Sequence, residues 1–342
     1  MMNKFGKELG EFLDFNNMSI KEFAERIDTT SKNLIDIIKG NVELSQNMIY
    51  NIAFITDIPV SYIENVESNF KLDKRLDKFV MDNHITMKEF INRFHYKEFS
   101  ESYHYTFSNV RNEYSIAKDI LKYLRITNPE KLYQEDNSIF YKSKNDKPEL
   151  LALWLERCYK IISEQEVMDY KSENIELLID YIKECAANYT FNEKELISKF
   201  NGNGIYLAIE DDLKGSKIRG AFKVLNDKPA IYITRKHKRY ADIYFALLHE
   251  LAHCKSDFNR AKKGSIISFH DEKNMEDYEL KADETAFNWM IPNSIYHFLK
   301  KDYSNIENLN TVKSFLVYRL AHDKIIDYSS SLYQKYNPII EG

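Results

Sequence analysis

The chain has 342 residues, of which 44% are hydrophobic and 30% are charged, with a formal net charge of -5. That length suffices for two or three domains with hydrophobic cores, and the composition is that of an ordinary globular protein, not of a fibrous or disordered one. Three widely spaced cysteines exclude a disulfide framework. The sequence shows neither a secretory signal nor an apolar run near the roughly 20 residues of a spanning helix, so we expect a cytoplasmic protein without membrane contact.

Residues 1–69 are expected to fold as a first, all-α domain of short amphipathic helices. Ser19 and Glu22 stand three residues apart ahead of an apolar pattern, as in a capping box at a helix start. Gly40 follows a second periodic stretch, and a glycine commonly stands just past the end of a helix. The helices expected here cover residues 20–27, 31–40, 45–56 and 59–66.

The rest of the chain divides into three expected regions. Residues 70–148 are polar and weakly patterned, and we interpret them as a helical connecting region. Within residues 149–300, helical periodicity gives way to short alternating segments rich in β-branched and aromatic residues and then returns, which predicts an α+β domain with a small antiparallel sheet. The expected strands are 204–209, 220–225 and 229–234, and the expected helices are 150–163, 174–188, 193–199, 239–254 and 275–290. Residues 301–342 are expected to form a C-terminal helical segment.

The strongest chemical signal is the run His249-Glu250-Leu251-Ala252-His253 inside a helical pattern. Residues four apart share one helix face, so both imidazoles can reach a single metal ion. Glu250 follows the first ligand directly and is placed to accept a proton, as a general base, from water activated by zinc. This spacing is the HExxH pattern of zinc peptidases. The competing interpretation is a core helix with two incidental histidines.

A third zinc ligand is expected on the following helix, because zinc in catalytic sites usually has three protein ligands. Glu279 is the candidate, and Asp283 shares its helix face four residues later. A carboxylate at Asp283 can accept the free N–H of a ligating histidine and fix its tautomer. A solvated acidic face is the alternative interpretation of both residues. His270, between the two helices, is a rival candidate for a ligand or an oxyanion donor.

Taken together, these segments resemble the ImmA/IrrE family of metallopeptidases over about residues 150–299. The segments that carry the likeness, in the order expected for the family, are Gly204–Leu207, Gly220–Phe222, Ala230–Ile233, Phe245–His253, Glu279–Phe287 and Met290–Pro292. The resemblance implies gluzincin-like zinc ligation and regulated cleavage of repressor-type proteins. Lys281 departs from the second glutamate that members often have, and Asp283 stands where asparagine is also common.

Residues 18–65 resemble XRE-type (Cro/repressor-like) helix-turn-helix domains, through Ser19–Ile27 and Ser31–Gly40. The fusion of such a domain to an ImmA/IrrE domain is similar to proteins described as HigA-like antitoxins and mobile-element regulators. In this arrangement the second helix of the motif would enter the major groove of DNA with its first residues near the bases. The candidate DNA-binding residues are Thr30, Ser31, Lys32 and Asn33.

The charge of the first domain argues against strong general DNA binding. Residues 1–70 contain six basic and eleven acidic residues, a net charge of -5. Phosphate contacts supply most of the non-specific affinity for DNA, and an acidic domain makes few of them. A local basic face, extended by homodimerisation through this domain, would still permit sequence-specific binding. The alternative is a helix-turn-helix kept as a protein-interaction module.

Two functions are therefore expected to compete. The first is a zinc-dependent endopeptidase that cleaves a regulatory, repressor-like protein, with Zn²⁺ as its cofactor. The second is a DNA-binding repressor or HigA-like antitoxin with a non-catalytic metal site, for which the partners would be operator DNA and a cognate toxin. The intact ligand set favours the first, because a structural site has no use for a glutamate beside its ligand.

Overall fold

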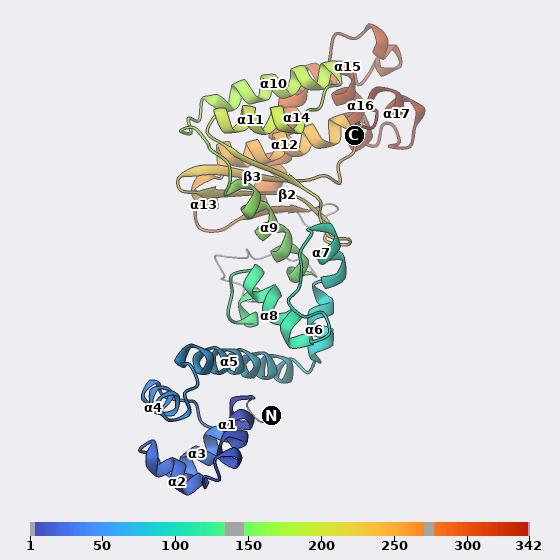
Figure 1. Ribbon diagram of the computed structural model, residues 1–342. Helices are drawn as coiled ribbons and strands as arrows, with labels where there is room; N and C mark the ends of the chain where they lie inside the picture. Colours follow the sequence, from blue (N-terminus) through green and yellow to red (C-terminus); the bar gives the residue numbers. More distant parts are fainter. Residues whose placement is uncertain (1–3, 134–146, 270–276, 341–342) are drawn as a thin grey trace. The chain divides into compact units, whose positions relative to one another are not determined.

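The computed structural model describes residues 4–133, 147–269 and 277–340 (Figure 1). Within these residues, many helices accompany one four-stranded sheet, so the predicted α+β class is confirmed. The chain divides into two compact units, and each is described by itself. The first comprises Met1–Phe90, Ser108–Lys122 and Ile126–Pro129, and the second comprises Ile91–Phe107, Tyr123–Arg125 and Glu130–Gly342.

Helices alone build the described part of the first unit. They are α1 (Lys4–Phe15), α2 (Ile20–Arg26), α3 (Ser31–Ile38), α4 (Gln46–Thr56) and α5 (Val60–Asp82). Two further helices, α6 (Met87–Arg93) and α8 (Glu113–Tyr123), are each divided between the two units. The side chains of Ser19, Thr30 and Ser45 accept hydrogen bonds from backbone N–H groups at the starts of α2, α3 and α4. These caps satisfy donors that a helix start leaves unpaired. Apolar side chains from α1 to α5 form one core beneath them.

The helix α5 is much longer than the sequence analysis predicted. We expected it to end at residue 66, and this was wrong, because neither a glycine nor a proline interrupts the chain between residues 60 and 82. The helix therefore continues through residues 69 and 70, where we had placed a domain boundary. Leu76 and Phe79 in its second half are buried, so this extension is packed rather than solvated.

The second unit is built on a sheet of β1 (Tyr206–Glu210), β2 (Ile218–Leu225), β3 (Lys228–Thr234) and β4 (Ile266–Phe269), in the order β1-β3-β2-β4. β2 is antiparallel to both β3 and β4, but β1 and β3 are parallel. The prediction of an antiparallel sheet was therefore wrong for one pair of strands. Asn226 and Asp227, both with positive φ, form a two-residue hairpin that folds β3 back between β1 and β2. β1 and β3 thus run in the same direction. The sequence analysis did not predict β4.

Helices cover both faces of this sheet (Figure 1). On one face, α9 (Pro148–Ile162) packs Trp154 and Cys158 against Ala230 and Tyr232 of β3. On the other face, Ile231 and Ile233 of the same strand enter a larger core with α10 (Asn174–Asn188), α11 (Glu193–Gly202), α12 (Tyr240–Ser256) and α14 (Asp277–Met290). The alternation of side chains along β3 thus makes a three-layered unit with α12 against the sheet.

Shorter elements complete the second unit. They are α7 (Tyr96–Ser102), a 3₁₀ helix at Pro129–Leu132 whose first residue belongs to the first unit, α13 (Phe258–Ala261), α15 (Asn293–Leu299), a 3₁₀ helix at Tyr303–Asn308, α16 (Lys313–His322) and α17 (Ser331–Tyr336). Leu316 and Leu320 of α16 enter the same core as α12, so part of the predicted C-terminal helical segment packs against the helix of the HExxH pattern. Among the described helices, none has the length and apolar character needed to cross a membrane.

Candidate metal centre

The helix α12 places two histidines and a glutamate in the interior of the second unit. Its residues from Ile243 to Cys254 are all buried, because the helix is apolar on nearly every side and lies between the sheet and outer helices. His249, Glu250 and His253 consequently have no exposed surface. Burial of histidine and glutamate side chains costs free energy unless each has a hydrogen-bond or charged partner. The groups around these three side chains therefore indicate their role.

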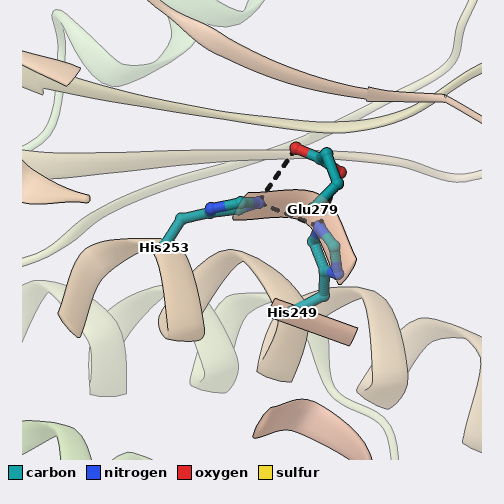
Figure 2. Close-up of side chains that lie close together, drawn as sticks. All are labelled: His249, His253 and Glu279. Carbon is teal, nitrogen blue, oxygen red and sulfur yellow. Dashed lines mark hydrogen bonds and ion pairs between the residues drawn. The ribbon is translucent and has the colours of Figure 1, made fainter. Parts of the chain in front are cut away.

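Glu279 of α14 faces the two histidines (Figure 2). The Nε2 atoms of His249 and His253 lie 3.0 Å apart. The carboxylate of Glu279 lies 3.2 Å from Nε2 of His249 and 3.1 Å from Nε2 of His253. The structure thus brings together, from two helices, the three residues that the sequence analysis selected as ligands.

The geometry of these three groups fits a metal ion. Zinc binds histidine nitrogen and carboxylate oxygen at about 2.0 to 2.2 Å, and tetrahedral ligands at those lengths are roughly 3.3 Å from one another. The separations of 3.0 to 3.2 Å are close to that value. Two imidazoles that point Nε2 at each other and at a carboxylate offer the nitrogen and oxygen donors that zinc prefers. This buried group could therefore hold a metal ion.

Each candidate histidine ligand has a carboxylate on its other ring nitrogen. Nδ1 of His249 lies 2.7 Å from Asp283, and Nδ1 of His253 lies 3.0 Å from Asp257. Such carboxylates accept the Nδ1–H, leave Nε2 free for a metal and hold the ring orientation. Burial opposes the charge on Asp283, but the hydrogen bond with His249 and the charge of Arg219 lower its pKa below the usual range, so it stays an anionic acceptor.

Glu279 is likewise held in its charged form. Burial alone would raise the pKa of this carboxyl, but its hydrogen bonds with His249 and His253 lower the pKa well below the usual value. Burial also opposes protonation of His253, yet hydrogen bonds to Asp257 and Glu279 raise its pKa to about 9. Both shifts express one fact: the carboxylates around this cluster stabilise positive charge at the point where the imidazoles meet.

Glu250 differs from the other carboxylates at the site. It is fully buried, and neither carboxylate oxygen has a hydrogen-bond partner within the described part of the chain. Burial raises the pKa of Glu250 above its usual value, against the lowering effect of the two histidines. An unpartnered buried carboxylate is costly for stability, and such groups call for an explanation such as a catalytic role or a bound ion or water.

The site includes residues that the sequence analysis did not select. Asp257 follows His253 by four residues on the same stretch of chain, so its spacing was a usable signal. Arg219 of β2 and Ser268 of β4 approach His249 from the sheet, at 2.9 and 3.1 Å. No local pattern marked these two: Arg219 lies just before the predicted strand 220–225, and β4, which carries Ser268, was not predicted. His270 lies outside the described residues.

A cavity opens beside the His249, His253 and Glu279 cluster. Its volume is about 520 Å³, and it is lined by Ser256 and Asp257 after the HExxH stretch and by Tyr278 and Lys281 of α14. Asp257 therefore connects His253 to this open space. Lys281, at which the sequence departs from the ImmA/IrrE pattern, lines this cavity.

The four candidate DNA-binding residues lie at the start of α3, in the first unit. Oγ1 of Thr30 accepts a hydrogen bond from the N–H of Asn33, and Nδ2 of Asn33 donates to Thr29. These two side chains are thus used to build the helix start. Lys32 is exposed, and Ser31 is partly buried.

The comparisons with known proteins leave the chain without an assigned family. No protein-family model matches it, and no curated protein matches it either.

Proposed function

We propose that the second unit is a zinc-dependent endopeptidase of the ImmA/IrrE type and that it cleaves a regulatory, repressor-like protein. The observation that carries this proposal is the carboxylate of Glu250, which is buried without a hydrogen-bond partner among the described residues beside a His-His-Glu cluster. A purely structural zinc site has four protein ligands and no use for a free base. A hydrolytic site needs three ligands, an open position and a base.

The roles of the residues follow from their contacts. His249, His253 and Glu279 would hold zinc, and Asp283 and Asp257 would keep Nε2 of each imidazole available for it. A bound zinc ion would supply a Lewis acid that makes water a nucleophile near neutral pH. Glu250 takes a proton from the attacking water at a carboxylate oxygen and delivers it to the departing amide nitrogen. Its raised pKa suits this exchange, because a base works best when its pKa approaches the working pH.

The first unit would bring the peptidase to its target. We propose that α2 and α3 form the helix-turn-helix, which binds operator DNA or the partner protein and supports a homodimer. Lys32 at the exposed start of α3 is the candidate for a phosphate contact. The net negative charge of this region favours a partner protein over non-specific DNA. The free thiols of Cys158, Cys185 and Cys254 suit a cytoplasmic setting.

A substrate trap tests this function. Full-length Glu250→Gln protein would be used to capture partners from host cells, beside the wild type and a Glu284→Gln control on the exposed face of α14. We expect a protein that is retained by Glu250→Gln and appears cleaved with the wild type and with the control. Partners retained intact by all three proteins, or DNA alone, would reject the peptidase and favour a repressor or HigA-like antitoxin bound to operator DNA or to a toxin.

A further inference from the structure

An irregularity in β2 turns Arg219 toward the metal centre. The register between β2 and β4 shifts between Ile218 and Gly220. Ile218 and Ala221, three residues apart, both pack in the core beside α9, whereas a regular strand would send them to opposite faces. The intervening residues face α12 instead: Arg219 contacts His249, and a Cβ atom on Gly220 would stand 2.5 Å from Oε1 of Glu250. A bulge of this kind commonly re-aims a side chain at a functional site.

The guanidinium of Arg219 is enclosed within the site. Its side chain is 12% exposed. Nη2 donates a hydrogen bond to Asp283 at 3.1 Å, and the guanidinium lies 5.4 Å from the centre of the Phe245 ring. Nε is buried and has no hydrogen-bond partner among the described residues. A buried charged group with an unused donor points to a ligand that completes its hydrogen bonds.

The contacts of Arg219 with His249 cannot persist once a metal binds. Nη2 lies 2.9 Å from Nδ1 and 3.0 Å from Nε2 of that ring. A metal on Nε2 and Asp283 on the Nδ1–H use both ring nitrogens, so neither can accept from an arginine. The guanidinium then keeps Asp283 and has N–H donors left for an oxygen atom at the metal centre.

The carboxylates around the site keep Arg219 positively charged. Burial alone would lower the pKa of Arg219, but the negative charges of Asp283, Glu250 and Glu279 raise it. An arginine cannot lose its proton in this setting, so it is a permanent cation and a planar donor. Negative charge develops on the carbonyl oxygen when a nucleophile adds to a peptide bond, and fixed donors beside that oxygen accelerate the reaction.

We propose that Arg219 binds the carbonyl oxygen of the peptide bond that is cleaved, an inference that rests on the proposed peptidase function. Water adds to the carbonyl carbon while Glu250 takes its proton, and the carbonyl π electrons move to the oxygen that Arg219 contacts. When this electron pair returns, the C–N bond breaks and the proton passes from Glu250 to the leaving nitrogen. Water and peptide are consumed, and a carboxylic acid and an amine are formed.

The test uses full-length protein loaded with Co²⁺, whose visible absorption reports ligands at the metal, and methylphosphonate as an oxyanion probe. The variants are Arg219→Ala and Arg219→Lys, with Arg235→Ala as a control whose contacts are to Glu193 and Glu210, away from the centre. We expect Arg219→Ala to weaken methylphosphonate binding about 10- to 100-fold, the effect of one charged hydrogen bond. Arg219→Lys, which keeps the charge, should recover part of it, and Arg235→Ala should bind as the wild type does.

Further readouts separate this role from a structural one and from the peptidase itself. Zinc affinity, from competition with a chelating dye, should stay within a few-fold in folded Arg219→Ala, and kcat on the captured substrate should fall about 10²- to 10³-fold. Unchanged methylphosphonate binding, or a loss of metal in both Arg219 variants, would overturn the inference. The wild type could also cleave nothing and still bind methylphosphonate through Arg219. That result would reject the peptidase function but support Arg219 as the contact for an anionic oxygen.

Discussion

Gly220 on β2 and Glu250 on α12 lie so close that a Cβ atom on Gly220 would stand 2.5 Å from Oε1 of Glu250. The same Cβ would lie 3.0 Å from the carbonyl oxygen of Tyr232. A side chain on Gly220 would thus collide with the carboxylate of Glu250, the candidate base, and a glycine avoids this collision. This contact ties the sheet to the chemistry of the helix, and it makes a glycine part of the site.

A methyl group at this position is expected to displace the base without removing the metal. Gly220→Ala should push the Glu250 carboxylate aside, and misplacement of a reacting group by about 1 Å can lower a rate by about 10²-fold. Zinc affinity should remain near that of the wild type, because none of the three ligands is touched. Cleavage kinetics and metal titration check this, with Gly202→Ala as the control, since a Cβ there meets nothing within 4 Å. Full activity in Gly220→Ala would contradict the expected displacement of the base.

Removal of a ligand is expected to abolish the effect of metal on stability. A metal that binds only the folded state stabilises it by about 2.7 kcal/mol at a concentration 100 times its dissociation constant. Addition of a chelator should therefore lower the thermal midpoint of the wild type but leave that of Glu279→Ala or His253→Ala unchanged. Calorimetry with and without zinc measures this. An equal response to chelator in all three proteins would place the metal elsewhere.

The two carboxylates on the Nδ1 atoms are expected to tune metal affinity without being ligands. Asp283→Ala and Asp257→Ala should each weaken zinc binding about 10- to 100-fold, as loss of such partners commonly does. The pairs are close, with His249 to Asp283 at 2.7 Å and His253 to Asp257 at 3.0 Å. Dye competition gives the affinities. A zinc affinity equal to the wild type in either variant would show that the carboxylate concerned does not support its histidine as a ligand.

Asp242 in the first turn of α12 is expected to make stability depend on pH. Burial raises its pKa from 3.8 to about 6, against hydrogen bonds from Tyr333 and Asn337 that lower it. Between these two values the folded protein holds the proton and the unfolded chain has lost it, so this group lowers stability as pH rises through the window. Asp242→Asn should remove that loss, so its stability relative to the wild type should increase by about 2 kcal/mol from pH 4 to pH 7. Urea unfolding at both pH values tests this, and a difference that is constant with pH would contradict it.

Thr30 is expected to matter for the fold of the first unit. Its hydroxyl caps α3 by accepting from the N–H of Asn33 at 3.1 Å. Thr30→Ala should lower the stability of this unit by about 1 kcal/mol, and Thr30→Ser should restore it. Lys32→Ala, at an exposed position, should leave stability unchanged and reduce any binding to DNA. Denaturant unfolding and a salt titration of DNA binding separate the two residues. Equal stability of Thr30→Ala and the wild type would deny it a capping role.

The local part of this site could be predicted from the sequence. Two histidines four residues apart share a face of any helix, and Glu279 and Asp283 do so by the same spacing, whatever surrounds them. The helix start at Ser19 was also marked, because a capping box depends on two residues three positions apart, here Ser19 and Glu22. The sequence by itself thus determined the helices that carry the site and the identity of the three candidate ligands.

Only the tertiary structure decided what meets these helices. The parallel pairing of β1 with β3, the shift of register at Arg219 and the approach of Gly220 to Glu250 all join segments that are distant in the chain. Strand register depends on which partner is adjacent and on where a bulge falls, and no periodicity within one strand encodes either. The contact of Arg219 with His249 could therefore not be predicted from the sequence, because it depends on how the sheet packs against α12.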